Sequence, residues 1–247
     1  MMESVESLVQ NYKATAAVHA VLKPIQTIML TGITGAGKDT IIADILQESD
    51  DFEKLVTSTT RAPRTNNGVM EVDGHEYYFL SHDQAERKIR DGEYVELALV
   101  HEKIYGSLVA EYQRIAGLNK IALTHIDYQG AAEYLSFGMD KLRVYFITPP
   151  SFEIYMARLL KRQGGKIDDH EELLRRFRSA QKELQNALDN PAFIPIMNED
   201  SRETARKIIA YAKDGTGPSE AERNHAYDVI KELGRSMSAY ISQIEEN

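Results

Sequence analysis

The first predicted element is a short helix that leads into a buried strand. Apolar residues recur at helical spacing between residues 5 and 22, and Pro24 follows them, which ends the helix because proline has no backbone N–H to donate. The uninterrupted apolar run at 27–31 is typical of a strand buried on both faces. The apolar residues of the helical pattern are Val5, Leu8, Val9, Tyr12 and Ala16.

A glycine-rich turn at residues 32–38 separates this strand from a second amphipathic helix. Two later apolar segments, at 121–124 and 142–147, are each followed by helical sequence. Strands that alternate with helices form parallel sheets. We therefore expect an α/β fold in which a parallel sheet is flanked by helices. The apolar stripe of the second helix contains Ile41, Ile42, Ile45 and Leu46.

The pattern changes between about residues 55 and 107. Short segments of alternating polarity, such as 76–80 and 94–98, are separated by turn residues at 66–68 and 73–74. Period-two alternation between turn signals indicates strands. We expect a small β-rich lobe, inserted into the sheet domain.

The C-terminal part of the chain is predicted to be mostly helical. Residues 151–189 form two helical patterns around the polar turn 163–166, which could serve as a lid hinge. The strand pattern at 193–197 contains Pro195, which favours the edge of a sheet. After a short linker at 213–219, a final helix begins with Ser219 and Glu222 at capping-box spacing. Its apolar stripe contains Ala226, Ile230, Leu233, Met237, Tyr240, Ile241 and Ile244.

The composition is that of a globular protein, with 43% hydrophobic and 27% charged residues in 247. The formal net charge of -9 provides no basic surface for a nucleic acid or an anionic membrane, so we expect neither partner. No run approaches the roughly 20 apolar residues of a membrane span, and Glu3 and Glu6 stand where a signal peptide carries basic residues. The chain has no cysteine, which excludes disulfides and fits the cytoplasm, where we expect the protein to work.

Residues 32–38 read Gly-Ile-Thr-Gly-Ala-Gly-Lys and match the G-x-x-x-x-G-K pattern of loops that bind nucleoside triphosphates. Glycines let backbone N–H groups converge on phosphate oxygens, and the ammonium of Lys38 reaches the β- and γ-phosphates. The strand before the loop and the helix after it supply the context that the pattern needs. The residues expected to contact the triphosphate are Gly32, Ile33, Thr34, Gly35, Ala36, Gly37, Lys38, Asp39 and Thr40.

Asp39 departs from this pattern, because Ser or Thr normally follows the lysine and binds Mg²⁺ through its hydroxyl. A carboxylate can bind Mg²⁺ directly, since hard cations favour oxygen ligands, but it adds negative charge beside the triphosphate. Asp39 is therefore a candidate metal ligand. The alternative is that Asp39 only occupies the first helical turn, where the helix dipole favours an acid.

Arg61 and Arg64 lie three residues apart on a segment stiffened by Pro63. The forked donors of two guanidinium groups at this spacing suit a phosphate clamp, whereas a solvated loop is the alternative. Further along, the chain reads G-H-E-Y-Y-F, G-E-Y-V-E, I-Y-G-S, I-D-Y-Q-G and P-P-S in that order. Together with S-T-T-R-A-P-R and the phosphate loop, these motifs resemble guanylate kinases over about residues 27–212. Guanylate kinases transfer the γ-phosphate of ATP to GMP.

The resemblance implies an organisation of three parts. Residues 1–25 are a helical extension, 26–212 are the guanylate kinase-like domain, and 213–247 are a linker and a helix. Within the domain, residues 55–107 are the GMP-binding lobe and 158–176 are the lid. The resemblance also implies that Arg61, Arg64, Tyr77 and Tyr105 hold the acceptor phosphate, and that Thr57, Glu96, Gly106, Ser107 and Asp127 lie near the guanine or its sugar.

Glu96 has the chemistry for guanine recognition. A carboxylate can accept from N1–H and the exocyclic amine of guanine, whereas adenine has no N1–H and would leave the anion partly unpaired. Thr57 stands where the family usually has Ser, which keeps the hydroxyl but adds a methyl group.

Arg158 and Arg162 are one helical turn apart, and like charges at this spacing repel unless an anion joins them. The resemblance implies that they are lid residues directed at phosphate, with Arg176 in the same set and Asn198 among the ATP-binding residues. Catalysis is then expected to rest on Lys38, Arg61, Arg158, Arg162 and Arg176.

His125 marks a second departure, because the family usually has an acid at this position, two residues before Asp127. One hypothesis is that the acid has been relocated, with Asp39 replacing it near Mg²⁺ and His125 filling the vacated volume. The other is decay of the enzyme into a binding module, against which the intact Lys38 and the arginine set argue.

The expected function is transfer of phosphate from MgATP to GMP or dGMP, with ATP and Mg²⁺ bound. One alternative is a kinase for another small phosphate ester, such as a ribose bisphosphate, because a related kinase also carries G-K-D. The other is a non-catalytic interaction domain of the same fold. The terminal helices could pack on the core, on each other or in a homodimer, so a monomer and a homodimer both stay open.

Overall fold

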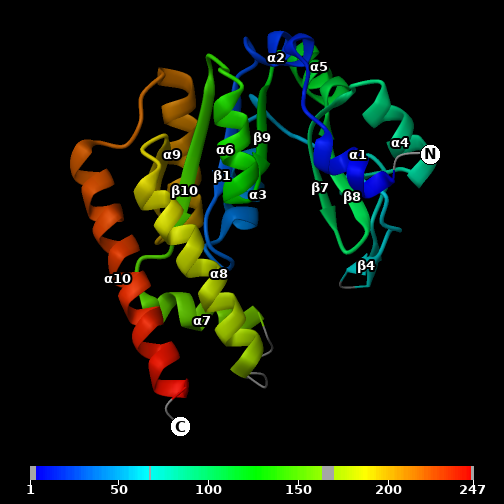
Figure 1. Cartoon of the computed structure of the whole chain (residues 1–247). Coiled ribbons are helices and arrows are strands. Elements are labelled where there is room, and N and C mark those ends of the chain that lie inside the picture. Colours follow the sequence, from blue (N-terminus) through cyan, green and yellow to red (C-terminus); the bar gives the residue numbers. More distant parts are fainter. Residues whose placement is uncertain (1–3, 67, 163–169, 246–247) are drawn as a thin grey trace. The chain divides into compact units, whose positions relative to one another are not determined.

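The computed structural model describes residues 4–66, 68–162 and 170–245 (Figure 1). The chain divides into two compact units. The first contains residues 1–27, 51–124 and 132–142, and the second contains residues 28–50, 125–131 and 143–247. Among the described residues, no helix combines the length and the apolar character needed to cross a membrane.

Five strands form a sheet in the order β11-β10-β1-β9-β2. β10 pairs with β11 and β2 pairs with β9, in both cases in parallel. All five residues of β1 are buried, as its unbroken apolar run predicts. Pro195 lies in β11 at the edge of the sheet, so the predicted α/β class and the edge position are both confirmed. The strands are β1 (Thr27–Thr31), β2 (Phe52–Lys54), β9 (Ile121–His125), β10 (Leu142–Thr148) and β11 (Phe193–Met197).

Helices make up much of the second unit. α3 packs on α9, and α10 packs on α7, α8 and β11, so that α10 runs beside α8 in Figure 1. The residues of α10 that are buried belong to its predicted stripe, and the ring of Tyr240 contacts Phe152 and Phe177. The helices are α3 (Lys38–Glu48), α6 (Tyr128–Ser136), α7 (Phe152–Arg162), α8 (His170–Asp189), α9 (Ser201–Asp214) and α10 (Glu220–Glu245).

The predicted capping box of α10 is present, since Ser219 Oγ accepts from the Glu222 N–H at 3.2 Å and Glu222 Oε2 accepts from the Ser219 N–H at 2.9 Å. The two helices predicted between residues 151 and 189 are α7 and α8. The polar turn predicted between them, at 163–166, lies outside the described residues.

The inserted lobe, about residues 55–107, belongs to the first unit and holds a sheet of order β6-β3-β8-β7. β3 runs parallel to β6, and β8 runs antiparallel to β3 and β7. A separate hairpin joins β4 to β5. The strands are β3 (Ser58–Thr59), β4 (Thr65–Asn66), β5 (Val69–Met70), β6 (Tyr78–Phe79), β7 (Tyr94–Val100) and β8 (Lys103–Leu108).

The lobe also contains a helix that the sequence analysis missed, α4 (His82–Arg90). Only Ala85 and Ile89 are buried in it, so its apolar stripe is too sparse to stand out among charged residues. Its start is fixed by a capping box in which Ser81 and Gln84 bond each other's backbone, which is itself a helix signal. A further helix, α5 (Val109–Gly117), follows the lobe.

The N-terminal segment forms two helices, α1 (Val5–Asn11) and α2 (Ala16–Leu22), so the prediction of one helix over residues 5–22 was wrong. The side chain of Thr15 accepts from the Val18 N–H and starts a new helix, because a Thr at an N-cap satisfies a backbone donor that lacks a helical partner. Tyr12, at the end of α1, has an extended backbone. The apolar spacing alone could not reveal this break.

Candidate functional site

The phosphate loop, residues 32–38, owes its shape to glycines with left-handed backbones. Gly32 has φ 130°, and a Cβ atom there would lie 2.2 Å from the carbonyl oxygen of Ile147. Gly37 has φ 98°, and a Cβ atom there would lie 2.4 Å from Nδ2 of Asn198. Neither position can hold a side chain. The loop ends at the N-terminus of α3, where the N–H groups of the first helical turn and the helix dipole favour an anion.

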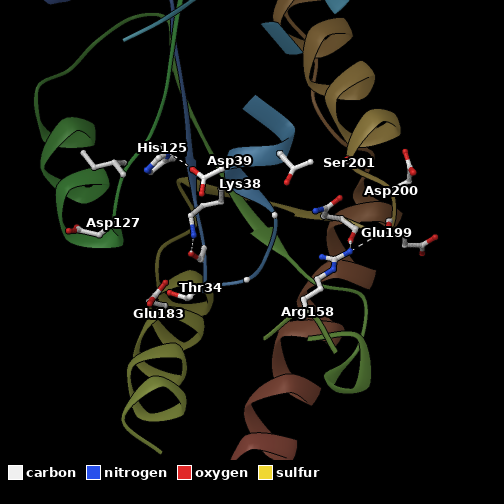
Figure 2. Close-up of a pocket in the computed structure, with 16 residues that line it drawn as sticks. Thr34, Lys38, Asp39, His125, Asp127, Arg158, Glu183, Glu199, Asp200 and Ser201 are labelled. Carbon is white, nitrogen blue, oxygen red and sulfur yellow. Dashed lines mark hydrogen bonds and ion pairs between the residues drawn. The ribbon is translucent and has the colours of Figure 1, made fainter. Parts of the chain in front are cut away.

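A cavity of about 700 Å³ lies against this loop, within the size range of sites for small molecules. Figure 2 shows side chains from the phosphate loop, from the segment after β9 and from α8 around it. The lining residues are Gly32, Thr34, Gly35, Gly37, Lys38, Asp39, Thr40, His125, Ile126, Asp127, Arg158, Glu183, Asn198, Glu199, Asp200 and Ser201. Of the residues predicted to contact the triphosphate, Ile33 and Ala36 are fully buried and do not line the cavity, so their contact with it stays a prediction.

The ammonium of Lys38 turns back over the phosphate loop (Figure 2). It donates to the carbonyl oxygen of Gly32 and, at 3.2 Å, to that of Ile33. An ammonium group has three donors and no acceptor. Lys38 therefore holds a positive charge over the cavity, where it can neutralise phosphate.

Arg158 and Asn198 both donate hydrogen bonds to the backbone of the phosphate loop. The Arg158 guanidinium donates to the carbonyl oxygens of Ala36 at 3.3 Å and Asn198 at 2.9 Å. The side-chain amide of Asn198 donates to the same Ala36 oxygen at 2.7 Å. Burial lowers the pKa of Arg158. The structure thus ties Arg158 to the loop backbone, and its predicted role in catalysis stays a prediction.

Asp39 and His125 meet at the mouth of this cavity. His125 Nδ1 lies 3.1 Å from Asp39 Oδ1, and the two side chains are 52% and 78% exposed. Figure 2 shows them pointing toward one another. Asp39 and His125, which both depart from the family pattern, are therefore direct neighbours. Among the described residues, no three His, Asp or Glu side chains are grouped so that they could hold a metal ion.

Glu183 of α8 is a cavity residue that the sequence analysis missed. Burial raises the pKa of its carboxyl group, against the attraction of Lys38, which lowers it. The available signal was its position on the helix that carries Arg176. Asp127, which also lines the cavity, is exposed and accepts from the Gly130 N–H at 2.8 Å. Its predicted contact with guanine or ribose stays a prediction.

The other two predicted lid residues are Arg176 and Arg162. Arg176 donates to Glu172 at 2.8 Å and lines a neighbouring cavity of about 220 Å³ together with Thr34 and Glu183. The side chain of Arg162 lies outside the described residues. Their roles in catalysis also stay predictions.

In the inserted lobe, Arg61 forms a buried ion pair that the sequence did not predict. Its guanidinium donates to both carboxylate oxygens of Glu71, at 2.8 and 3.0 Å, and Glu71 also accepts from the Arg64 N–H at 2.8 Å. The hydrogen bonds that Arg61 donates to the Glu71 carboxylate raise the pKa of Arg61. The Arg64 side chain, by contrast, is exposed. Arg64 is thus the more accessible half of the predicted phosphate clamp.

The structure brings Tyr77 and Tyr105 together with Arg61. The two rings meet edge to face at 6.0 Å between centroids, and the Arg61 guanidinium lies 5.2 Å from the Tyr77 centroid. A cation at this distance is attracted by the ring face. Burial raises the pKa of Tyr77, so its hydroxyl stays protonated as a donor. Three of the four residues predicted to hold phosphate therefore form one cluster.

Glu96 and Ser107 form a second pair in the lobe. The Ser107 N–H and hydroxyl both donate to Oε1 of Glu96, at 3.0 and 2.7 Å. β7 and β8 approach so closely here that a Cβ atom on Gly106 would lie 2.4 Å from the Glu96 carbonyl oxygen. Thr57 lies just before β3, and its carbonyl oxygen accepts from the Tyr78 N–H at 2.9 Å. The predicted guanine-binding carboxylate is thus oriented by its neighbouring strand.

Comparisons with known proteins identify the family of this chain. The family model described as guanylate kinase matches residues 25–212. A guanylate kinase of Clostridioides difficile is 32% identical over 181 residues, which cover 73% of this chain and 83% of that protein. A guanylate kinase of Sus scrofa is 29% identical over 179 residues, covering 72% and 86%. The crystal structure of guanylate kinase from Anaplasma phagocytophilum has the same fold, with a TM-score of 0.55 at 23% identity over 82% of this chain and 90% of that chain. The chain belongs to the guanylate kinase family.

Proposed function

We propose that this protein transfers the γ-phosphate of ATP to GMP, giving ADP and GDP. The observation that carries the proposal is the Glu96–Ser107 pair, in a chain that also holds an intact phosphate loop. Two hydrogen bonds from Ser107 fix Oε1 of the carboxylate, which orients Glu96 to accept from the guanine N1–H and amine. A site built to accept these hydrogens rejects bases that lack them.

Catalysis on this site rests on charge and position. The acceptor phosphate oxygen is already anionic near neutral pH, so the reaction needs no general base. Lys38 and the N-terminus of α3 neutralise the charge that spreads over the moving phosphoryl group. Arg158 and Asn198 hold Ala36 of the loop, which keeps the loop N–H groups in place without reorganisation during transfer.

The loop also fits a magnesium ion. Asp39 and Thr40 offer a carboxylate and a hydroxyl at the cavity, and Mg²⁺ prefers such oxygen donors together with substrate phosphates. When bound, Mg²⁺ supplies positive charge to the β- and γ-phosphates. We propose that Asp39 takes over the metal-linked role of the acid that His125 has replaced. Their separation of 3.1 Å supports this idea, because the two changes then act at one place.

The relocation is tested with Asp39→Ser, His125→Asp and the double variant. Mg²⁺ dependence of turnover is measured for each, and binding of Mn²⁺ with ATP is followed by paramagnetic resonance as a readout apart from activity. We expect each single variant to weaken metal binding and the double variant to recover it. Additive losses would reject the relocation.

The main experiment assays purified protein with MgATP against a panel of nucleoside monophosphates, with Lys38→Ala as the control. We expect GMP to be the preferred acceptor, dGMP to follow it, and Lys38→Ala to stay folded but lose most turnover. Equal rates in both proteins would refute the assignment. Calorimetric titration with ATP separates an enzyme from an interaction domain, which would bind ATP weakly or not at all.

The comparisons offer no support for either alternative function. A kinase for a ribose bisphosphate would not need Glu96, which is present and fixed by Ser107. Four residues of the α10 stripe, Ala226, Ile230, Leu233 and Met237, are buried, so that part of the stripe packs within the chain rather than in a dimer. We propose a cytoplasmic enzyme on the cysteine-free composition, and its oligomeric state stays a prediction.

A further inference from the structure

Tyr12 binds the backbone of the inserted lobe from outside the region that matches the family. The family match begins at residue 25, and Tyr12 follows α1. Its hydroxyl donates to the carbonyl oxygen of Tyr94 at 2.5 Å and accepts from the N–H of the same residue at 3.1 Å. A single phenol thus pairs both backbone groups of the residue at which β7 begins.

This contact lies on the outer strand of the lobe sheet. β7 is the last strand in the order β6-β3-β8-β7, and an edge strand leaves backbone groups on its outer side without a strand partner. Tyr12 therefore does for Tyr94 what a neighbouring strand does elsewhere in a sheet. Burial raises the pKa of Tyr12, so the hydroxyl keeps its proton for this bond.

Helix α1 holds Tyr12 in this place by packing on the lobe. α1 contacts α4 and β7, as Figure 1 shows for these three elements. Val9 of α1 is 7% exposed and joins the core cluster of the lobe, and Val5 and Leu8 pack against that cluster. The ring of Tyr12 meets the ring of Tyr94 edge to face at 6.4 Å. The hydrogen bonds are thus anchored by an apolar contact rather than made by a loose tail.

The residue that Tyr12 holds lies beside the guanine-binding carboxylate. Tyr94 pairs with Leu108 whereas Glu96 pairs with Ser107, so β7 carries an irregularity between Tyr94 and Glu96. Such a bulge disrupts the ladder and bends the strand. The direction in which the Glu96 side chain projects from β7 therefore depends on the backbone conformation at Tyr94.

The side chain of Tyr94 also connects the start of β7 to β3 and β8. Its hydroxyl lies 3.1 Å from the Ser58 hydroxyl, and Ser58 lies 3.1 Å from the carbonyl oxygen of Gly106. Ser58 follows Thr57, and Gly106 precedes Ser107. β7 and β8, which carry predicted guanine-binding residues, and β3, which directly follows Thr57, thus meet at Tyr94.

We propose that Tyr12 is a positioning residue for guanine recognition, which fixes the start of β7 and through it the Glu96–Ser107 pair. The inference rests on the proposed function, because it takes Glu96 to read guanine. It assigns a role in acceptor binding to a segment that precedes the family region. We expect nucleotide binding at the phosphate loop not to depend on this contact, because Tyr12 and residues 32–38 belong to different compact units.

Tyr12→Phe tests the proposal, since it removes both hydrogen bonds and keeps the ring that packs on Tyr94. Tyr227→Phe on α10 makes the same chemical change in the second unit and serves as the matched control. Calorimetry gives the affinities for GMP and for ATP, and steady-state kinetics gives KM and kcat. We expect Tyr12→Phe to weaken GMP binding about tenfold, to raise KM for GMP equally, and to leave ATP affinity and kcat at saturating GMP unchanged.

A double-mutant cycle with Ser107→Ala separates positioning from general loss of stability. If Tyr12 acts through the Glu96–Ser107 pair, the loss caused by Tyr12→Phe is clearly smaller in the Ser107→Ala background than in the wild type. Equal losses in both backgrounds, or GMP binding by Tyr12→Phe at wild-type strength, would overturn the inference while the proposed function stands. A wild-type protein that binds ATP but no GMP would instead reject the proposed function, and the inference with it.

Discussion

The buried pair of Arg61 and Glu71 allows a quantitative test of how the inserted lobe is held. Glu71→Gln removes the negative charge and keeps the side-chain volume. Both side chains are nearly buried, at 9% and 7% exposure, and the guanidinium bonds both carboxylate oxygens. The substitution therefore leaves a buried cation without its counter-charge.

The expected cost follows from this burial. Breaking a buried ion pair by removing one partner costs about 3–5 kcal/mol, and we expect the lower value of about 3 kcal/mol because glutamine keeps one acceptor for Arg61. For a protein of this size, such a loss lowers the unfolding temperature by roughly 6–12 °C. The phosphate of GMP can replace the missing anion, so saturating GMP should stabilise Glu71→Gln more than the wild type.

Thermal unfolding by circular dichroism, with and without GMP, measures both effects. Glu86→Gln is the matched control, because Glu86 pairs with Arg90 on α4 at 2.7 Å with both side chains partly exposed, and exposed pairs contribute at most about 1 kcal/mol. If Glu71→Gln unfolds at the same temperature as Glu86→Gln, the reasoning on the buried pair is wrong. If GMP stabilises Glu71→Gln no more than the wild type, Arg61 does not face the acceptor phosphate.

Three further predictions concern other parts of the chain. Gly37→Ala forces a side chain into a backbone with φ 98° and should weaken ATP binding about tenfold or more; an unchanged calorimetric affinity would contradict this. Ile230→Ala, at a position with 0% exposure on α10, should destabilise the second unit by about 2–5 kcal/mol in denaturant unfolding, whereas a change near zero would show that α10 is an independent appendage. Burial opposes ionisation of Glu53, but hydrogen bonds from Lys120 and Arg114 outweigh it and lower its pKa, so this carboxylate stabilises the fold above its unfolded-state pKa of about 4.3 and loses that contribution as pH falls through the lower folded-state value. In Glu53→Gln, the free energy of unfolding should therefore fall less steeply as the pH is lowered into the acid range. An identical pH dependence of stability in both proteins would contradict this role of Glu53.

Features that depend on neighbouring residues could be predicted from the amino-acid sequence alone. The phosphate loop could be predicted because its glycines, its lysine and the flanking strand and helix are consecutive, and their backbone geometry follows from local sterics. The buried strand β1, the edge strand with Pro195 and the capped helix α10 followed from local patterns in the same way. The order of the family motifs then predicted the residues that bind the acceptor.

Predictions from the spacing of apolar residues were wrong or incomplete where a few specific contacts fix the backbone. The pattern over residues 5–22 predicts one helix, but the cap at Thr15 divides it, and the backbone at Tyr12 is extended where its hydroxyl binds Tyr94. α4 escaped notice because burying two side chains, Ala85 and Ile89, is enough for a helix that packs on one small core.

Contacts between residues that are distant in the sequence could be found only in the folded chain. Nothing in the spacing of Asp39 and His125, or of Tyr12 and Tyr94, indicates that they touch, because contacts between remote segments depend on the whole course of the chain. Glu71, which directly follows the hairpin of β4 and β5, pairs with Arg61, and the sequence analysis gave it no role. The sequence thus determines the chemistry that the chain carries, whereas folding sets the charges and hydrogen bonds that orient it.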